Sequence, residues 1–196
     1  MKIIKRIIII ITLIGLVTGA ILIKNGYEMY KNAIDEIPLI EKVENIRKKE
    51  NYTKIEEVPQ IYIDAVISVE DHRFYKHNGI DIIAITRAAI NDIKAMSFVE
   101  GGSTISQQLS KNIYFTQEKE ITRKIAEVFM AFEIEKNYEK DEILELYLNT
   151  SYYGDGYYTI KEACKRILQQ RTKRNDKSRS NTTCRNTKCT LSIRTY

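Results

Sequence analysis

Cysteine is missing from most of this 196-residue chain, because its three cysteines all lie between residues 164 and 196. The first 163 residues therefore contain no disulfide bond, which suits an exported protein whose fold does not depend on one. Proline is scarce as well, and Pro38 and Pro59 are the only positions at which it can break a helix. No segment shows the sustained alternation of apolar and polar residues that a half-buried sheet needs. These absences predict an all-α body.

A uniformly basic surface is also missing, although the formal net charge is +5. Residues 164–196 hold ten lysines and arginines against one acid, Asp176, and carry a charge of +9. Residues 1–163 hold 21 basic and 25 acidic residues, which gives a charge of −4. Because the body is mildly acidic, the overall basicity does not indicate nucleic acid as a partner. The length allows one folded domain once a targeting segment is removed.

Residues 7–23 form an almost wholly apolar run without charge, preceded by three basic residues and closed by Lys24. This run lies at the short end of a membrane-spanning helix but exceeds the usual apolar region of a signal peptide. No small-x-small cleavage site follows it. We expect residues 1–24 to be an uncleaved signal anchor that crosses the cytoplasmic membrane once, with its positive end in the cytoplasm and the remaining chain outside. A cleaved signal peptide is the alternative.

The pattern of apolar residues beyond the anchor is helical. Residues 25–54 are charged and mixed, and we expect a juxtamembrane helix and linker there. Residues 55–163 are expected to form a folded all-α domain. Its predicted helices cover residues 61–69, 80–96, 103–114, 118–136 and 140–149.

Residues 164–196 change character abruptly, with few aliphatic residues and a run of Arg, Lys, Asn, Ser and Thr. One interpretation is a disordered basic tail that lies on an anionic membrane surface or binds nucleic acid. The other is a frameshift near Cys164. Codons chosen for residue 167 onward and read one nucleotide later give a consistent peptide with an apolar helical pattern and a proline-rich end. Under this hypothesis the tail is out of frame and the domain is incomplete.

Residues 101–112 form a glycine-led turn that runs into a polar, amide-rich helix start. Two glycines let the backbone approach a ligand closely, while Ser103 and Thr104 can cap a helix whose free N–H groups favour negative charge. Further hydrogen-bond donors follow one turn later, at Gln107, Gln108 and Lys111. The run suits a polar or anionic ligand, and a capped surface helix after a flexible loop is an equally good explanation.

Glu70 ends the apolar helix expected at residues 61–69. Partial desolvation of a carboxylate at that position would favour its protonated form and suit a general acid or base, whereas a solvated helix cap is the more common arrangement. His72 and His77 lie five residues apart, which is a poor spacing for metal ligands. We therefore predict no metal site at these histidines.

Arg123, Lys124 and Glu127 lie on the helix expected at residues 118–136. Arg123 and Glu127 can form an i, i+4 pair, worth about 0.3–0.5 kcal/mol. Alternatively, the two cations face a phosphate and Glu127 is a second active-site carboxylate. The spacing alone does not decide between these interpretations.

These pieces form four blocks: Glu70-Asp71-x-x-Phe74-x-x-His77-x-Gly79, then residues 101–112, then Arg123-Lys124-x-x-Glu127, and last Lys140-x-x-Ile143-Leu144-Glu145-Leu146-Tyr147-Leu148-Asn149. In order and approximate spacing they resemble the peptidoglycan glycosyltransferase family. This family is the transglycosylase domain of class A penicillin-binding proteins and of monofunctional biosynthetic transglycosylases. The peptide from the shifted frame resembles the next block of the family as well. Ser106 stands where many members have threonine.

The resemblance implies a lysozyme-like, two-lobed, all-α fold, anchored by one N-terminal helix, that polymerises lipid II on the outer face of the cytoplasmic membrane. Glu70 would be the general base that takes a proton from the sugar 4-hydroxyl of incoming lipid II. Glu127 would be the second essential carboxylate, near the lipid pyrophosphate that leaves with inversion at the anomeric carbon. The residues expected to bind substrate are Asp71, Phe74, His77, Gly102, Ser103, Thr104, Gln107, Gln108, Lys111, Asn112, Arg123 and Lys124. In the fourth block we expect a structural helix in which Glu145 and Asn149 brace the site.

The partners implied by the resemblance are lipid II, the growing glycan chain, the membrane and other cell-wall synthesis proteins. No cofactor is required, and a divalent cation, Mg or Mn, is compatible with the pyrophosphate. Two other functions stay open. One is a lysozyme-like, glycan-cleaving enzyme that uses Glu70 as an acid, against which the cationic pair argues, because cleaving glycan releases no pyrophosphate. The other is a non-catalytic, membrane-tethered fragment.

Overall fold

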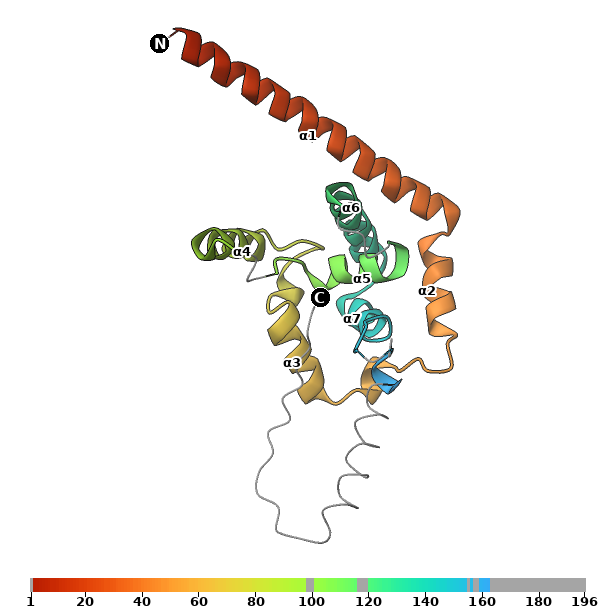
Figure 1. Ribbon diagram of the computed structural model, residues 1–196. Helices are drawn as coiled ribbons and strands as arrows, with labels where there is room; N and C mark the ends of the chain where they lie inside the picture. Colours follow the sequence, from red (N-terminus) through yellow and green to blue (C-terminus); the bar gives the residue numbers. More distant parts are fainter. Residues whose placement is uncertain (1, 98–100, 116–119, 155, 157–158, 163–196) are drawn as a thin grey trace.

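The computed structural model describes residues 2–97, 101–115, 120–154, 156 and 159–162. Over these residues the chain is helical and has no strand, which confirms the all-α prediction. The elements are α1 (Lys2–Glu36), α2 (Leu39–Arg47), η1 (Ile55–Glu57), α3 (Gln60–Glu70), η2 (Phe74–Lys76), α4 (Ile82–Ala95), α5 (Ile105–Tyr114), α6 (Ile121–Asn137) and α7 (Lys140–Leu148) (Figure 1). Every helix predicted from the apolar pattern is present.

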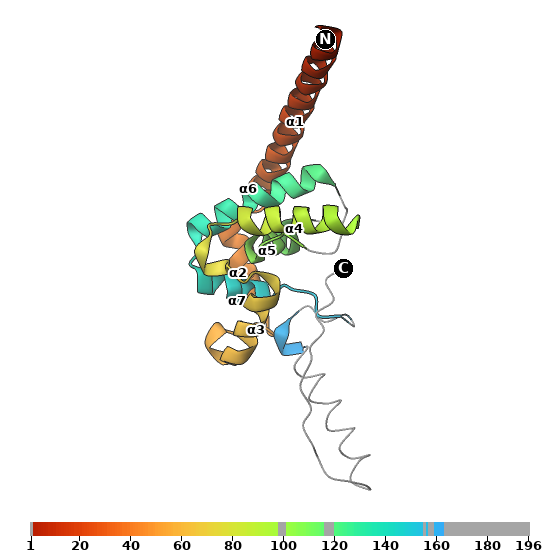
Figure 2. The same cartoon turned by 90° about the vertical axis from the view of Figure 1, so that its left-hand side faces the viewer.

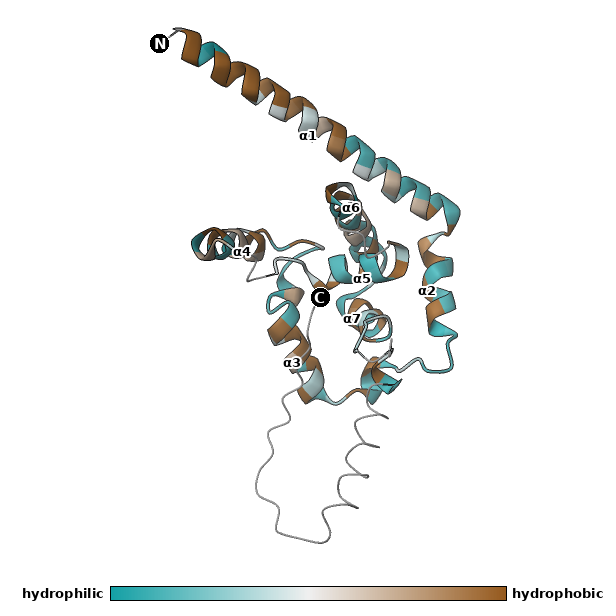
Figure 3. Ribbon diagram, viewed as in Figure 1, coloured by the Kyte–Doolittle hydropathy of each residue, from teal (hydrophilic) through white to brown (hydrophobic). Residues whose placement is uncertain are grey.

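α1 is one continuous helix, and its apolar first half stands clear of the rest of the molecule (Figures 1 and 3). Within the described part of the chain, it alone is long and apolar enough to cross a membrane, judged by length and composition. The helix does not end at residue 24 but continues to Glu36, because no proline interrupts it before Pro38. The predicted anchor is therefore the first part of a longer helix.

The second half of α1 packs across α6. At the crossing, a Cβ atom on Gly26 would lie 2.5 Å from Ile125 Cγ2, so glycine is required for this approach. The rings of Tyr27 and Tyr30 contact Phe129, with centroid separations of 5.4 and 6.0 Å. The segment expected to be a juxtamembrane helix thus joins the apolar half of α1 directly to the folded domain.

α5 lies at the centre of the domain, between α6 and α7 (Figures 1 and 2). Its fully buried Ile105 and Leu109 belong to one apolar core together with Met130 of α6 and Leu144 of α7. α2, which lies in the segment expected to be a linker, joins the same core through Leu39, Val43 and Ile46. The burial of these side chains fixes α5 relative to its neighbours.

α4 lies at the side of the domain and begins at Ile82, because Asp81 caps it. The Asp81 carboxylate accepts the N–H groups of Ile83 and Ala84 at 2.9 and 3.2 Å. The isoleucines of α4 at positions 82, 83, 85, 90 and 93 are exposed, and Figure 3 marks the hydrophobic residues of this helix in brown. Gly102 approaches α4 so closely that a Cβ atom there would lie 3.2 Å from Ile85 Cα. The loop before α5 is thereby held against α4.

Candidate active site

Glu70 is the last residue of α3, as predicted, and its half-buried side chain reaches α5. The side-chain amide nitrogen of Gln108 donates a hydrogen bond to Glu70 Oε2 at 3.0 Å. The oxygen of the same amide accepts a hydrogen bond of 3.2 Å from the Tyr147 hydroxyl on α7. Three helices therefore meet at the Glu70 carboxylate through one glutamine.

Asp71 connects the end of α3 to the start of α5. Its buried Oδ2 accepts the N–H of Ile105 at 3.1 Å and lies 2.9 Å from His77 Nε2. The carboxylate thus satisfies one of the free N–H groups in the first turn of α5. Because Asp71 directly follows Glu70, this contact fixes the position of Glu70 along the axis of α5.

The turn that follows is fastened to the same helix. Thr104 caps α5 in a capping box with Gln107, and its hydroxyl donates to the Gly79 carbonyl at 2.6 Å. Gly79 has φ +92°, and a Cβ atom there would lie 3.2 Å from the Phe132 ring of α6. The positive φ favours glycine, and the Phe132 ring leaves little room for a Cβ atom. The first and second sequence blocks are therefore held in register by buried hydrogen bonds.

Several residues expected to bind substrate lie in the interior instead of lining an open surface. Phe74, Thr104 and Gln107 are buried, and the His77 side chain is 6% exposed. Their contacts are with protein groups: Phe74 lies under the Lys140 ammonium group, which is 4.5 Å from the ring centroid. In the structure these four residues hold the blocks together.

Glu127 on α6 is buried, with 1% of its surface exposed, and is paired with both preceding cations. Arg123 contacts its Oε1, and Lys124 Nζ lies 2.9 Å from its Oε2. Lys124 also donates to the Ser103 hydroxyl at 2.7 Å, so Ser103 holds this lysine while Thr104 alone caps the helix. The intrahelical pair considered from the sequence is present. A buried carboxylate requires such partners.

Lys111, Arg123 and Lys124 form a cluster of positive charge beside Glu70. Burial, followed by the charges of Arg123 and Lys111, lowers the pKa of Lys124 to about 8. The pKa of Lys111 is lowered by burial and by Arg123, and the nearby Glu70 carboxylate opposes that change. Since these positive charges repel one another, an anion bound among them would stabilise the site.

The remaining predicted residues are placed elsewhere. Asn112 lines a separate cavity of about 300 Å³ between α2, α5 and α7, and the structure does not bring it to the cation cluster. Glu145 accepts hydrogen bonds from Tyr52 and from the Ile55 N–H, while the Asn149 amide bonds both backbone groups of Thr53. The fourth block therefore braces the segment before η1, in line with the structural role predicted for it.

Two features of the site were missed from the sequence. One is Tyr147, whose hydroxyl reaches Gln108 from a helix face that is otherwise leucine and isoleucine; a phenol in such a run was the available signal. The other is Glu135, which accepts from Ser106 and pairs with Lys140 at 2.8 Å. The tail at residues 164–196, which the frameshift hypothesis concerns, lies outside the described residues.

Residues 38–178 match the protein family described as Transglycosylase. The chain belongs to this family. A monofunctional glycosyltransferase of Staphylococcus epidermidis is 44% identical over 124 residues, which cover 63% of this chain and 46% of that protein. Penicillin-binding protein 1F of Bacillus subtilis is 50% identical over 109 residues, covering 56% of this chain and 15% of the relative. Penicillin-binding protein 1A of Aquifex aeolicus is 45% identical over 116 residues, covering 59% and 16%.

The resemblance seen in the four sequence blocks is thereby confirmed at the level of the family. A lysozyme-like, all-α fold fits a transglycosylase domain, and the long apolar α1 fits a membrane-anchored protein. The chain spans 46% of the length of the first of these relatives.

Proposed function

We propose that this protein is a peptidoglycan glycosyltransferase that polymerises lipid II into glycan strands. The observation that carries the proposal is the meeting of Glu70 with a cluster of three cations, Lys111, Arg123 and Lys124, across α3, α5 and α6. A hydroxyl nucleophile needs a base, and a diphosphate leaving group needs fixed positive charge. The membership of the transglycosylase family supports the same reaction.

In the proposed reaction, Glu70 takes the proton of the sugar 4-hydroxyl of incoming lipid II. The oxygen then forms a bond to the anomeric carbon of the growing chain, with inversion. The bond from that carbon to the diphosphate breaks, and its electron pair leaves with the lipid diphosphate. Lys111, Arg123 and Lys124 offset the charge on the diphosphate oxygens. Gln108 donates a hydrogen bond to Glu70 Oε2 and so holds the carboxylate that acts as the base.

Glu127 has a different task in this proposal. Its carboxylate is buried and held by Arg123 and Lys124, so it orients both cations instead of exchanging a proton with substrate. The same pairing makes Glu127 a poor ligand for Mg²⁺ or Mn²⁺, because two cations already occupy its oxygens. The proposed mechanism therefore routes no step through a metal ion.

The membrane-spanning part of α1 would hold the domain on the outer face of the cytoplasmic membrane, with the basic N-terminus inside. A lipid-linked substrate lies in the same membrane, so anchoring keeps enzyme and substrate in one plane. Other cell-wall synthesis proteins are the partners expected there.

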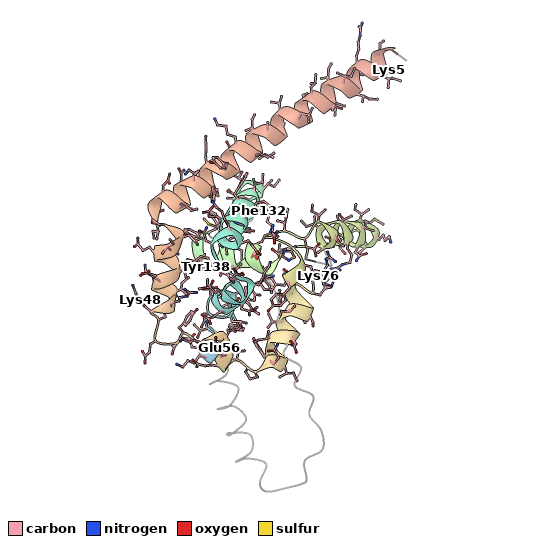
Figure 4. All side chains as sticks on the ribbon, turned by 180° about the vertical axis from the view of Figure 1, so that it is seen from behind. Lys5, Lys48, Glu56, Lys76, Phe132 and Tyr138 are labelled. Atoms are coloured by element: carbon pink, nitrogen blue, oxygen red, sulfur yellow. The ribbon has the colours of Figure 1, made fainter. Side chains whose placement is uncertain are left out.

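Incubation of the purified, detergent-solubilised chain with labelled lipid II tests the proposal. We expect glycan polymer from the wild type and from Glu56→Gln, and none from Glu70→Gln. Glu56 is an exposed glutamate of η1, at the opposite end of the domain from α6 (Figure 4). Digestion of finished cell-wall glycan would point instead to a lysozyme-like enzyme. Neither activity would point to a non-catalytic fragment.

A further inference from the structure

A chain of two hydrogen bonds runs from α7 to Glu70. The Tyr147 hydroxyl donates to Gln108 Oε1 at 3.2 Å, and Gln108 Nε2 donates to Glu70 Oε2 at 3.0 Å. Tyr147 is 6% exposed, so it lies beneath the surface that a substrate could reach. Neither the sequence blocks nor the proposed reaction gives this phenol a role.

The orientation of the Gln108 amide matters because its two ends have opposite character. An ionised carboxylate only accepts hydrogen bonds, so the NH₂ end must face Glu70 when Glu70 is a base. The amide oxygen then faces Tyr147, where the phenol supplies a proton. Turning the amide by 180° would place its oxygen against the Glu70 carboxylate, where two acceptors would face each other, and the Tyr147 hydroxyl would have to accept from the NH₂ end instead of donating. A protonated Glu70 would accommodate that turned orientation by donating to the oxygen.

Burial and the nearby Glu70 carboxylate raise the pKa of the Tyr147 phenol. The hydroxyl therefore keeps its proton at neutral pH and remains a donor. Among the described residues, Lys111 lies close to Glu70, and Tyr62 lies close to Tyr147. Lys111 does not set the direction of the Gln108 amide.

We propose that Tyr147 is a positioning residue, which fixes the Gln108 side chain so that its NH₂ group faces Glu70 and holds that carboxylate in the ionised form a general base needs. This inference rests on the proposed function. Tyr147 acts through Gln108 and does not touch the substrate.

Tyr147→Phe removes the hydroxyl and keeps the ring. With labelled lipid II, we expect kcat near pH 7 to fall about 2–10-fold, the equivalent of one hydrogen bond. We expect the acidic limb of the kcat profile to move to higher pH, with KM nearly unchanged. The double variant with Gln108→Ala should be no slower than Gln108→Ala alone, because Tyr147 acts through Gln108. Tyr75→Phe removes an exposed phenol bonded to Asp141 and is the matched control, expected to leave the profile in place.

An unmoved acidic limb, or effects of the two variants that simply add, would overturn the proposal and leave Tyr147 a packing residue. Carbon-13 NMR titration of the Glu70 carboxyl group gives a readout that does not depend on turnover. The titration midpoint should rise in Tyr147→Phe and stay constant in Tyr75→Phe. If the wild-type chain makes no polymer but the titration midpoint still rises in Tyr147→Phe, the proposed function is contradicted and the hydrogen-bond chain is supported.

Discussion

We expect one lysine, Lys124, to set the alkaline limb of the pH profile of the proposed activity. The pKa of Lys124 is lowered to about 8, mainly because its half-buried side chain loses hydration and secondarily because the charges of Arg123 and Lys111 lie near it. Lys124 Nζ also lies 2.9 Å from Glu127 Oε2. If the Lys124 charge is needed to bind the diphosphate, the enzyme must lose affinity as this lysine deprotonates.

The size of the effect follows from that pKa. At pH 7 about nine tenths of Lys124 is charged, and at pH 9 about one tenth, so kcat/KM should fall about 10-fold between these values. The loss belongs to kcat/KM, which reports the free enzyme, because a bound diphosphate raises the lysine pKa again. Lys124→Arg should abolish the limb, since a guanidinium group stays protonated throughout this range.

The assay is the initial rate of polymer formation from labelled lipid II, at concentrations below KM, between pH 6 and pH 10. Lys76→Arg is the matched control, because Lys76 is an exposed lysine of η2 (Figure 4) and should keep the wild-type limb. A wild-type kcat/KM that stays level to pH 9.5, or a limb that persists unchanged in Lys124→Arg, would refute the reasoning.

Three further outcomes concern stability. The pKa of Lys124 in the folded chain lies below the ordinary lysine value of 10.5, so the unfolded chain binds more protons between pH 8 and pH 10.5. Stability measured by urea unfolding should therefore rise with pH over that window. Glu127→Gln leaves two cations without their buried partner and should cost about 3 kcal/mol, seen as a lower urea midpoint; an unchanged midpoint would contradict the pairing. Gly26→Val should cost about 1–3 kcal/mol by overpacking against Ile125, whereas Gly15→Ala, with open space around it, should not lower the melting temperature.

The helices and the order of the blocks could be predicted from the sequence because they depend on local patterns. The apolar periodicity located α3 to α7, and the acid at the end of an apolar helix pointed to Glu70. The continuation of α1 to Glu36 could not be predicted in the same way. Its polar second half looked like a linker, and its packing depends on contacts between Gly26 and Ile125, which lie about a hundred residues apart. Sequence patterns carry little information about such distant pairs.

Neighbouring residues of the second block have different roles, and these roles could be assigned only from the structure. Gln107 and Gln108 are adjacent and chemically identical, but successive side chains on a helix point about 100° apart. Gln107 therefore turns inward to complete the capping box with Thr104, while Gln108 faces Glu70. Lys111, three residues after Gln108, lies on the same face and reaches the cation cluster, whereas its neighbour Asn112 lines another cavity. The chemistry of a residue can be inferred from its type, but its role is decided by which helix face the neighbouring elements bury.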